Sequence, residues 1–148
     1  PLKSKDTFIT KNKFINCNGG IRFLGVKDGK NAADPITGQV METQAGENFN
    51  VIGNTFIGKM KRDAIHIRSY HHVQHQNVFI AANQFEDASQ SIHLENINGL
   101  TLNQEQTKIK IKSKIQNSKG IHDFNNSQKN ENRDELPEFV KERLQKNL

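Results

Sequence analysis

The sequence has little of what builds a thick globular core. Only 33% of its 148 residues are hydrophobic, and the mean hydropathy is −0.78. This composition does not favour a large apolar core, and we expect one domain with a thin, elongated core. Tryptophan is absent and tyrosine occurs once, whereas phenylalanine occurs nine times. We expect the phenylalanines that recur in the sequence pattern to stack in the core instead of contacting a ligand.

Cysteine and long hydrophobic runs are nearly absent. Cys17 is the single cysteine, so an internal disulfide is excluded, and its position after Phe14 and Ile15 predicts a small buried side chain instead of a nucleophile. No apolar run reaches the length of a membrane span or resembles a signal peptide. Because the chain begins at Pro1 without an initiator methionine, we expect a fragment of a longer chain, whose upstream residues could complete a site.

Nucleotide-binding and hydrolase signatures are also missing. The sequence has no P-loop, no dinucleotide fingerprint and no GxSxG elbow, and we predict no cofactor. The net charge of +5 and the pI near 9.4 permit an anionic partner, but much of the excess lies between Lys108 and Lys119. We interpret this run as a basic solvated edge. Nucleic-acid binding is the weaker alternative, because no base-reading motif accompanies the run, and no membrane partner is predicted.

A short pattern recurs along the chain. In each copy an aliphatic residue is followed three positions later by Asn and two positions after that by Phe. The copies are ITKNKF at 9–14, VIGNTF at 51–56 and IAANQF at 80–85, and a degenerate copy at 100–105 ends in Glu105. Such internal repetition indicates a stacked repeat architecture.

Short strands lie between the repeats, with no helical pattern among them. Strands of three to five residues that recur at intervals above 20 residues must pair in parallel with their equivalents in the next coil, which predicts a β-solenoid. The phenylalanines then stack in a column. We expect the repeated Asn to adopt the left-handed conformation and to bond to the Asn of the adjacent coil. The predicted ladder is Asn12, Asn54, Asn83 and Asn103.

The boundaries follow from composition. We predict coils over 1–116, interrupted by an inserted loop at 28–48, then a polar loop or tail at 117–133. Alternation over 109–115 predicts a last coil or edge strand with lysines outward. Residues 134–148 predict an amphipathic helix that caps the open end of the solenoid. Docking of this helix on another domain or subunit is the alternative, because it would use the same apolar stripe. That stripe is Leu136, Phe139, Val140 and Leu144.

The NxF turns, each followed by IRF, IHI or IHL, resemble the right-handed parallel β-helix of the pectin-lyase-like superfamily over roughly residues 7–102. The resemblance implies an all-β fold of about four coils. It also implies a polysaccharide- or glycan-active protein, such as a glycoside hydrolase, lyase, epimerase or phage tailspike, with an extracellular or periplasmic location. The sequence departs from the superfamily's better-known members, since it has no paired-Asp or GHG motif and no dense acidic calcium cluster.

Period-two alternation places the middle residues of the three strands outward and in line. The resulting stripe is Arg22, His66, Arg68, His93 and Glu95. We predict Asp63, His66, His93 and Glu95 as catalytic acid or base residues, and Arg22 and Arg68 as substrate-binding groups, because arginines bind carboxylates or sulfates. A stripe of ordinary solvated polar groups is the alternative.

A turn rich in histidine follows the second of these strands. We predict that Tyr70, His71 and His72 contact a sugar from a loop beside the stripe. His71 and His75 have the i, i+4 spacing of a helical zinc site, but the flanking sequence does not indicate a helix, and no metal is predicted.

Two functions remain open. The first is a glycoside hydrolase or polysaccharide lyase, or its C-terminal part, acting on a glycan bound along the outer stripe. The second is a non-catalytic phage tailspike segment or glycan-binding adhesin, which predicts an oligomer, a trimer for a tailspike.

Overall fold

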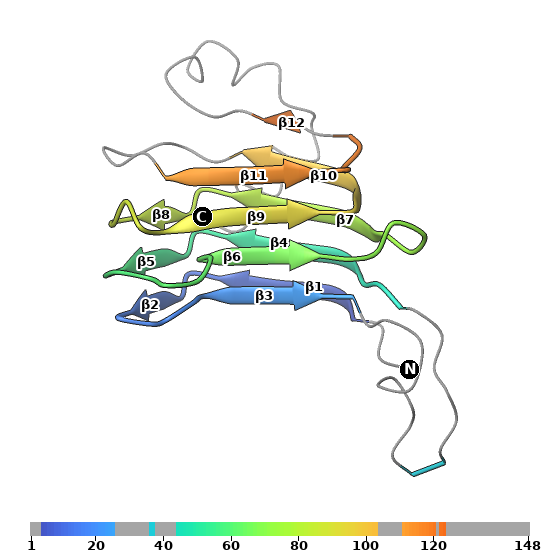
Figure 1. Cartoon of the computed structure of the whole chain (residues 1–148), viewed down its shortest axis with the longest axis horizontal. Coiled ribbons are helices and arrows are strands. Elements are labelled where there is room, and N and C mark those ends of the chain that lie inside the picture. The colour runs from blue at the N-terminus through green and yellow to red at the C-terminus, as the bar shows by residue number, and fades with distance from the viewer. Residues whose placement is uncertain (1–3, 26–35, 38–43, 104–110, 121, 124–148) are drawn as a thin grey trace.

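A computed structural model of the chain describes residues 4–25, 36–37, 44–103, 111–120 and 122–123 (Figure 1). Within these ranges the secondary structure is entirely β, and the strands are short. No helix in the described ranges has the length and apolar character needed to cross a membrane. The expectation of an all-β chain built from short strands is confirmed for this part of the sequence.

The strands follow one another in groups of three. The first group is β1 (Lys5–Thr10), β2 (Lys13–Ile15) and β3 (Ile21–Leu24). The second is β4 (Glu47–Ile52), β5 (Thr55–Ile57) and β6 (Ile65–Arg68). The third is β7 (His75–Ala81), β8 (Gln84–Phe85) and β9 (Ser91–Glu95). The remaining strands are β10 (Ile97–Asn103), β11 (Lys112–Gln116) and β12 (His122–Asp123).

Each group contributes one strand to each of three sheets, and all the pairings between strands are parallel (Figure 1). Sheet A has the order β1-β4-β7-β10-β12, sheet B the order β2-β5-β8, and sheet C the order β11-β9-β6-β3. The chain therefore visits the sheets in turn and stacks each strand on its equivalent, as in a solenoid. The predicted parallel stacking of equivalent strands is confirmed.

Aromatic side chains stack between the sheets as the repeat predicts. The rings of Phe14, Phe56 and Phe85 form one column, with centroid separations of 4.9 and 5.1 Å. A second column joins Phe23 to Phe49 at 3.9 Å and to His75 at 4.3 Å. The sequence did not indicate that an imidazole would continue this second column inside the core.

The predicted asparagine ladder is present, but its asparagines do not have the backbone conformation that we predicted. The Oδ1 of Asn54 accepts from the backbone N–H and the side-chain Nδ2 of Asn12, and the Oδ1 of Asn83 accepts equivalently from Asn54. The left-handed residues are the ones just before, Lys11 (φ 56°) and Ala82 (φ 54°), so the expectation that the ladder asparagines themselves are left-handed is wrong. They are held in place by hydrogen bonds across the coils.

Other predicted boundaries are shifted or fall outside the described residues. β4 begins at Glu47, so the last two residues of the predicted loop at 28–48 belong to a strand. β11 is the edge strand of sheet C, and Ile111 and Ile115 pack against the core as predicted. The side chain of Asn103, most of the loop and the helix over 134–148 lie outside the described part of the chain. Cys17 is partly buried and packs against the core.

Sheet A has an apolar outer face that sequence reasoning missed. Phe49, Val51, Val78 and Ile80 belong to the cluster between the sheets, and Ile52, Phe79 and Ala81 form a separate buried cluster. Because successive residues of a strand point to opposite faces, the second cluster lies on the outside of the sheet. The outer face of sheet A is therefore apolar at Ile52, Phe79 and Ala81, although Asn50 of β4 also points outward.

Candidate functional site

Sheet C carries a column of charged and imidazole side chains on its outer face. The strand register pairs Arg22 with His66, His66 with His93, and His93 with Lys114. Two residues further along the same strands, Arg68 pairs with Glu95. The inward residues on either side of His66, Ile65 and Ile67, are fully buried. The predicted outer stripe is therefore present with the register that the sequence indicated.

Asp63 is held beside this column by its neighbours in the coils on both sides. Its carbonyl oxygen accepts the backbone N–H of Gly20 at 3.2 Å, and the Ala64 N–H of the same peptide unit donates to the Ser91 carbonyl oxygen at 2.8 Å. A Cβ at Gly20 would clash with the Ala64 carbonyl oxygen, so the close approach of the two coils here requires glycine. The Ser91 hydroxyl donates to Asp63 Oδ1 at 2.7 Å and orients the carboxylate.

The Asp63 carboxylate lies close to both imidazoles. Its Oδ2 is 3.8 Å from His66 Nδ1 and 4.0 Å from His93 Nδ1. The two rings stack with centroids 4.7 Å apart and planes inclined by 7°. These distances are longer than hydrogen bonds, so the carboxylate acts on the pair through charge, and small rotations would bring either Nδ1–H into bonding range.

Burial makes the neutral form of His66 favourable. Desolvation is the main reason that the pKa of His66 lies below its ordinary value of 6.5, and the neighbouring His93 lowers it further, while Asp63 opposes the shift. The Nε2 atoms of His66 and His93 are buried and make no hydrogen bond among the described residues. Glu95 Oε2 lies 3.4 Å from His93 Nε2, an ion-pair distance without hydrogen-bond geometry. Two buried ring nitrogens therefore lack a hydrogen-bond partner among the described residues, and such groups are rare in folded proteins.

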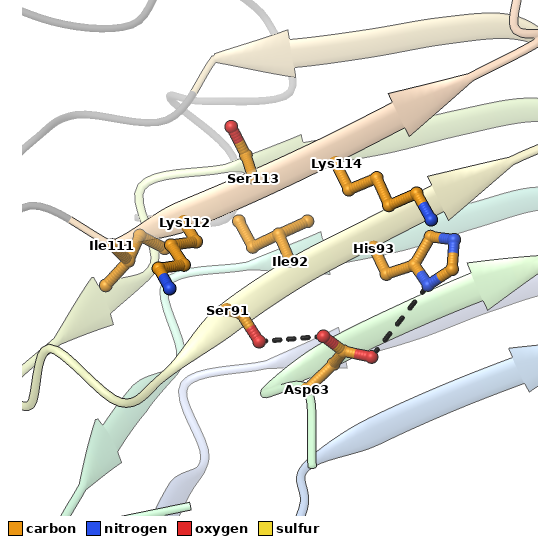
Figure 2. A pocket seen from close by; sticks show the side chains of 8 residues that line it. All are labelled: Asp63, Ser91, Ile92, His93, Ile111, Lys112, Ser113 and Lys114. Atoms are coloured by element: carbon orange, nitrogen blue, oxygen red, sulfur yellow. Dashed lines mark hydrogen bonds and ion pairs between the residues drawn. The ribbon is translucent and has the colours of Figure 1, made fainter.

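A pocket of about 740 Å³ opens beside His93 (Figure 2). Its lining comes from the approach to β6, from β9 and from β11, namely Asp63, Ser91, Ile92, His93, Ile111, Lys112, Ser113 and Lys114. Figure 2 shows the Lys114 side chain running across to His93, while Asp63 faces both Ser91 and His93. The pocket thus combines a carboxylate, an imidazole and two ammonium groups.

Asp63, His66 and His93 are also the kinds of residue that bind transition metals, and one ligand atom from each lies within 4.8 Å of the others. The imidazole lone pairs lie in the ring planes, and these planes are nearly parallel, so the two Nδ1 atoms do not converge on one point. An ion bound to both rings would require one of them to rotate. The arrangement as it stands fits a carboxylate shared by two imidazoles better than a metal centre.

In the structure, His71 and His72 lie in the turn after β6, whereas His75 belongs to β7. Tyr70 and Val73 close a tight turn with His71 and His72 exposed at its tip, and His71 Nδ1 lies 3.1 Å from Asn117 Nδ2 beyond β11. This turn follows the carboxyl end of β6, whereas Asp63 precedes the strand. The described contacts of the turn do not join it to the Asp63 cluster, so the sugar-contact role of Tyr70, His71 and His72 stays a prediction.

His75 does not belong to that turn. It is fully buried at the start of β7, where its Nδ1 accepts the Gly46 N–H at 2.9 Å and its Nε2 lies 2.9 Å from the Arg68 carbonyl oxygen. Burial lowers its pKa below the ordinary value. Because both ring nitrogens of His75 are engaged by the backbone, His75 cannot share a zinc ion with His71 in this conformation.

Sequence reasoning missed Ser91 and the lysines of β11 as parts of the site. The alternation at 109–115 indicated outward lysines, but it did not show which strand β11 would join. The sequence did contain a signal for Lys114. If β11 pairs with β9 in the register of the earlier coils, Lys114 lies beside His93 and extends the column of middle residues. Comparison with protein-family models, curated proteins and solved structures gives no match for this chain.

Proposed function

We propose that this protein is a polysaccharide lyase, or part of one, that binds an acidic glycan along the outer face of sheet C and cleaves it by elimination. The observation that carries the proposal is the pair of stacked imidazoles beside Asp63, in a column that also holds Arg22 and Lys114. The Nε2 atoms of the two rings make no hydrogen bond to the described residues. We further propose that the solenoid is a right-handed parallel β-helix of about four coils of the pectin-lyase-like type.

The cations of the column suit a sugar that carries a carboxylate. Arg68 lies on β6 together with His66, whereas Arg22 lies on β3 and Lys114 on β11, the strands that flank the two histidine strands in sheet C. Ion pairs with the glycan carboxylate would make the proton on the adjacent ring carbon more acidic and stabilise the negative charge that develops when it leaves. The same groups would bind neighbouring acidic sugars along the column.

An imidazole suits the role of base, and at His66 burial favours the neutral form that can accept a proton. In the proposed step, the ring of His93 or His66 rotates so that its buried Nε2 meets the substrate and takes the proton from the carbon next to the carboxylate. The electron pair of that C–H bond forms a carbon–carbon double bond as the glycosidic C–O bond on the next carbon breaks. The leaving oxygen departs with a proton from Glu95 or water. Asp63 would stabilise the imidazolium that forms, and Ser91 would hold Asp63 in position.

Hydrolysis by a pair of carboxyl groups is less well supported. Asp63 approaches one side of His93 at 4.0 Å and Glu95 approaches the other at 3.4 Å, so an imidazole occupies the space between the two acids. A glycosidase needs that space for the scissile bond and, in inverting enzymes, for water. This arrangement favours imidazole chemistry over a carboxyl pair.

The test is turnover on a panel of uronate-containing, sulfated and neutral polysaccharides. Elimination leaves a conjugated double bond at the new chain end and therefore raises ultraviolet absorbance together with reducing ends, whereas hydrolysis raises reducing ends alone. His93→Ala and His66→Ala should lower kcat by about 10² to 10⁴-fold if they transfer the proton. Lys13→Ala, which removes an exposed cation from sheet B, is the matched control and should leave the rate unchanged.

Three results would change the assignment. Wild-type rates in both histidine variants would remove them from catalysis. Reducing ends without ultraviolet absorbance would replace elimination with hydrolysis. Saturable binding without any product would assign the chain to the non-catalytic glycan-binding class, and light scattering would then show whether it is the trimer expected of a tailspike.

A further inference from the structure

The sequence contains two asparagines that are followed directly by glycine, Asn18 before Gly19 and Asn98 before Gly99. In such a pair the backbone nitrogen of the glycine can attack the side-chain carbonyl carbon of the asparagine, because no glycine side chain shields it. The structure places the two pairs in different surroundings. The first lies in the connection between β2 and β3, whereas the second lies within β10 (Figure 1).

In the Asn98–Gly99 pair, both of the groups that would react are held by hydrogen bonds. Nδ2 of Asn98 donates to Gln76 Oε1 at 2.9 Å. The Gly99 N–H donates to the Lys119 carbonyl oxygen at 3.0 Å. Asn98 also pairs with Gln76 in the register of β10 with β7. Attack of Gly99 on Asn98 would break these bonds and turn the peptide out of the sheet, so the folded chain opposes the reaction.

In the Asn18–Gly19 pair, the same two groups are open. Asn18 is exposed, and neither its side-chain amide nor the Gly19 N–H makes a hydrogen bond among the described residues. The bonds of this segment lie on either side of the reacting groups. The Asn18 carbonyl oxygen accepts the Arg62 N–H at 2.9 Å, and the Gly20 N–H donates to the Asp63 carbonyl oxygen at 3.2 Å. Rotation of the peptide between Asn18 and Gly19 therefore disturbs the bond from Arg62 but no strand pairing.

We propose that Asn18 is a site of spontaneous modification in the folded protein, where the link to Gly19 converts to aspartyl and isoaspartyl forms while Asn98 is preserved. The Gly19 N–H gives its proton to a solvent base, and its nitrogen forms a bond to Cγ of Asn18. The bond from Cγ to Nδ2 breaks, and ammonia leaves with a proton from water. Water then opens the cyclic imide at Cγ, which gives aspartate, or at the main-chain carbonyl carbon, which gives isoaspartate.

The isoaspartyl product affects the segment that positions Asp63. It adds a methylene group to the main chain between positions 18 and 19, and the former main-chain carbonyl of residue 18 becomes a free carboxylate. That carbonyl oxygen is the acceptor of the Arg62 N–H. The coils have little spare room here, since a Cβ on Gly19 would lie 3.1 Å from Arg62 Cβ. The added carbon therefore shifts the first coil against Arg62 and Asp63. Neither this shift nor the modification depends on the proposed lyase activity.

Peptide mapping by mass spectrometry tests the proposal. The wild-type protein is incubated at mildly alkaline pH, both folded and unfolded in guanidinium chloride, and conversion of amide to acid is followed at Asn18 and Asn98. Each folded rate is divided by the unfolded rate at the same position, which removes the influence of the flanking residues. The ratio should be near one at Asn18 and roughly tenfold or more lower at Asn98, which reacts only after its hydrogen bonds open. Asn18→Gln, whose longer side chain closes a less favourable ring, is the matched control and should remove the fast reaction.

A ratio at Asn18 that is no higher than the ratio at Asn98 would overturn the proposal. Isoaspartate is identified by methylation with an isoaspartyl methyltransferase, and an absence of methylated product at position 18 would overturn the isoaspartyl part.

The shift of the coil has its own measurement. The isoaspartyl form, separated by chromatography, should melt about 2 to 4 °C below Asn18→Asp, which carries the new charge without the extra carbon. This is the effect of losing about one hydrogen bond in a chain of this size. Equal melting temperatures would overturn the predicted shift beside Asp63.

Discussion

Sheets A and C stack equivalent residues of successive coils in register, and they differ in what their outward columns carry. The outward cluster of sheet A is Ile52, Phe79 and Ala81, which are buried, whereas the outward column of sheet C contains Arg22, His66 and His93. In a stacked repeat, equivalent outward positions of successive coils lie side by side, so apolar side chains can gather on one sheet and polar side chains on another. The apolar cluster is buried, whereas the polar column can form a binding face.

The largest expected effect comes from placing a charge in the buried cluster of sheet A. Phe79→Asp removes a buried ring and buries a carboxylate without a designed partner, and it should cost more than about 4 kcal/mol of unfolding free energy. Arg68→Gln, an exposed outward position on sheet C, should change stability by less than about 0.5 kcal/mol. Urea denaturation followed by circular dichroism measures both. Similar losses in the two variants would mean that the outer faces do not differ as described.

The next prediction distinguishes His75, which lies inside the solenoid, from the histidines on the outer face of sheet C. His75 is buried and neutral, and its pKa is lowered chiefly by burial, so the unfolded chain binds the proton more readily. Stability should therefore be constant above the ordinary pKa of 6.5 and should fall as pH drops below it toward the folded-state pKa. His75→Phe keeps a ring in the aromatic column and should flatten this dependence in thermal melts between pH 5 and 7.5. A pH dependence that survives this substitution would point to another group, with His66 as the next variant to examine.

A smaller effect concerns charge on sheet C. If Lys114 pairs with an acidic group of the glycan, Lys114→Gln should weaken binding by roughly tenfold, equivalent to one charge-assisted hydrogen bond. Lys13→Gln on sheet B is the control for a general loss of positive charge. Affinity is measured by calorimetry at low and high salt, and the difference between the variants should shrink as salt rises. Equal affinities for wild type and Lys114→Gln at low salt would remove β11 from the binding face.

The smallest effect tests how Asp63 is positioned. Ser91→Ala removes the hydroxyl that donates to Asp63 Oδ1, and it should reduce kcat by about three- to tenfold, the value of one hydrogen bond, with little change in KM. Ser91→Thr retains a hydroxyl and should restore most of the rate. If Ser91 merely supports the fold, both variants would lower the melting temperature and neither would alter kcat at a temperature where the protein is folded.

The repeat allowed much of the fold to be predicted because its chemistry is local. An aliphatic residue, an Asn and a Phe at fixed spacing specify a short strand and the stacking of its equivalents, as the Phe14, Phe56 and Phe85 column confirms. The same register predicts from the sequence alone that His66 lies beside His93, as the pairing of β6 with β9 confirms. The conformation of the ladder asparagines was wrong because the left-handed position falls one residue earlier, at Lys11 and Ala82, and spacing alone does not distinguish the two.

The sequence by itself determined the periodicity, and with it the parallel stacking and the alignment of the outward residues on β3, β6 and β9, because both follow from strand alternation repeated at a constant interval. Tertiary structure decided which strand β11 would join, that Ser91 would reach Asp63, and that His75 would enter the core. It also decided that Ile52 and Phe79 would be buried although they point outward from sheet A. These outcomes depend on contacts between residues of different coils and on what packs over a face, and no pattern within a single strand encodes them.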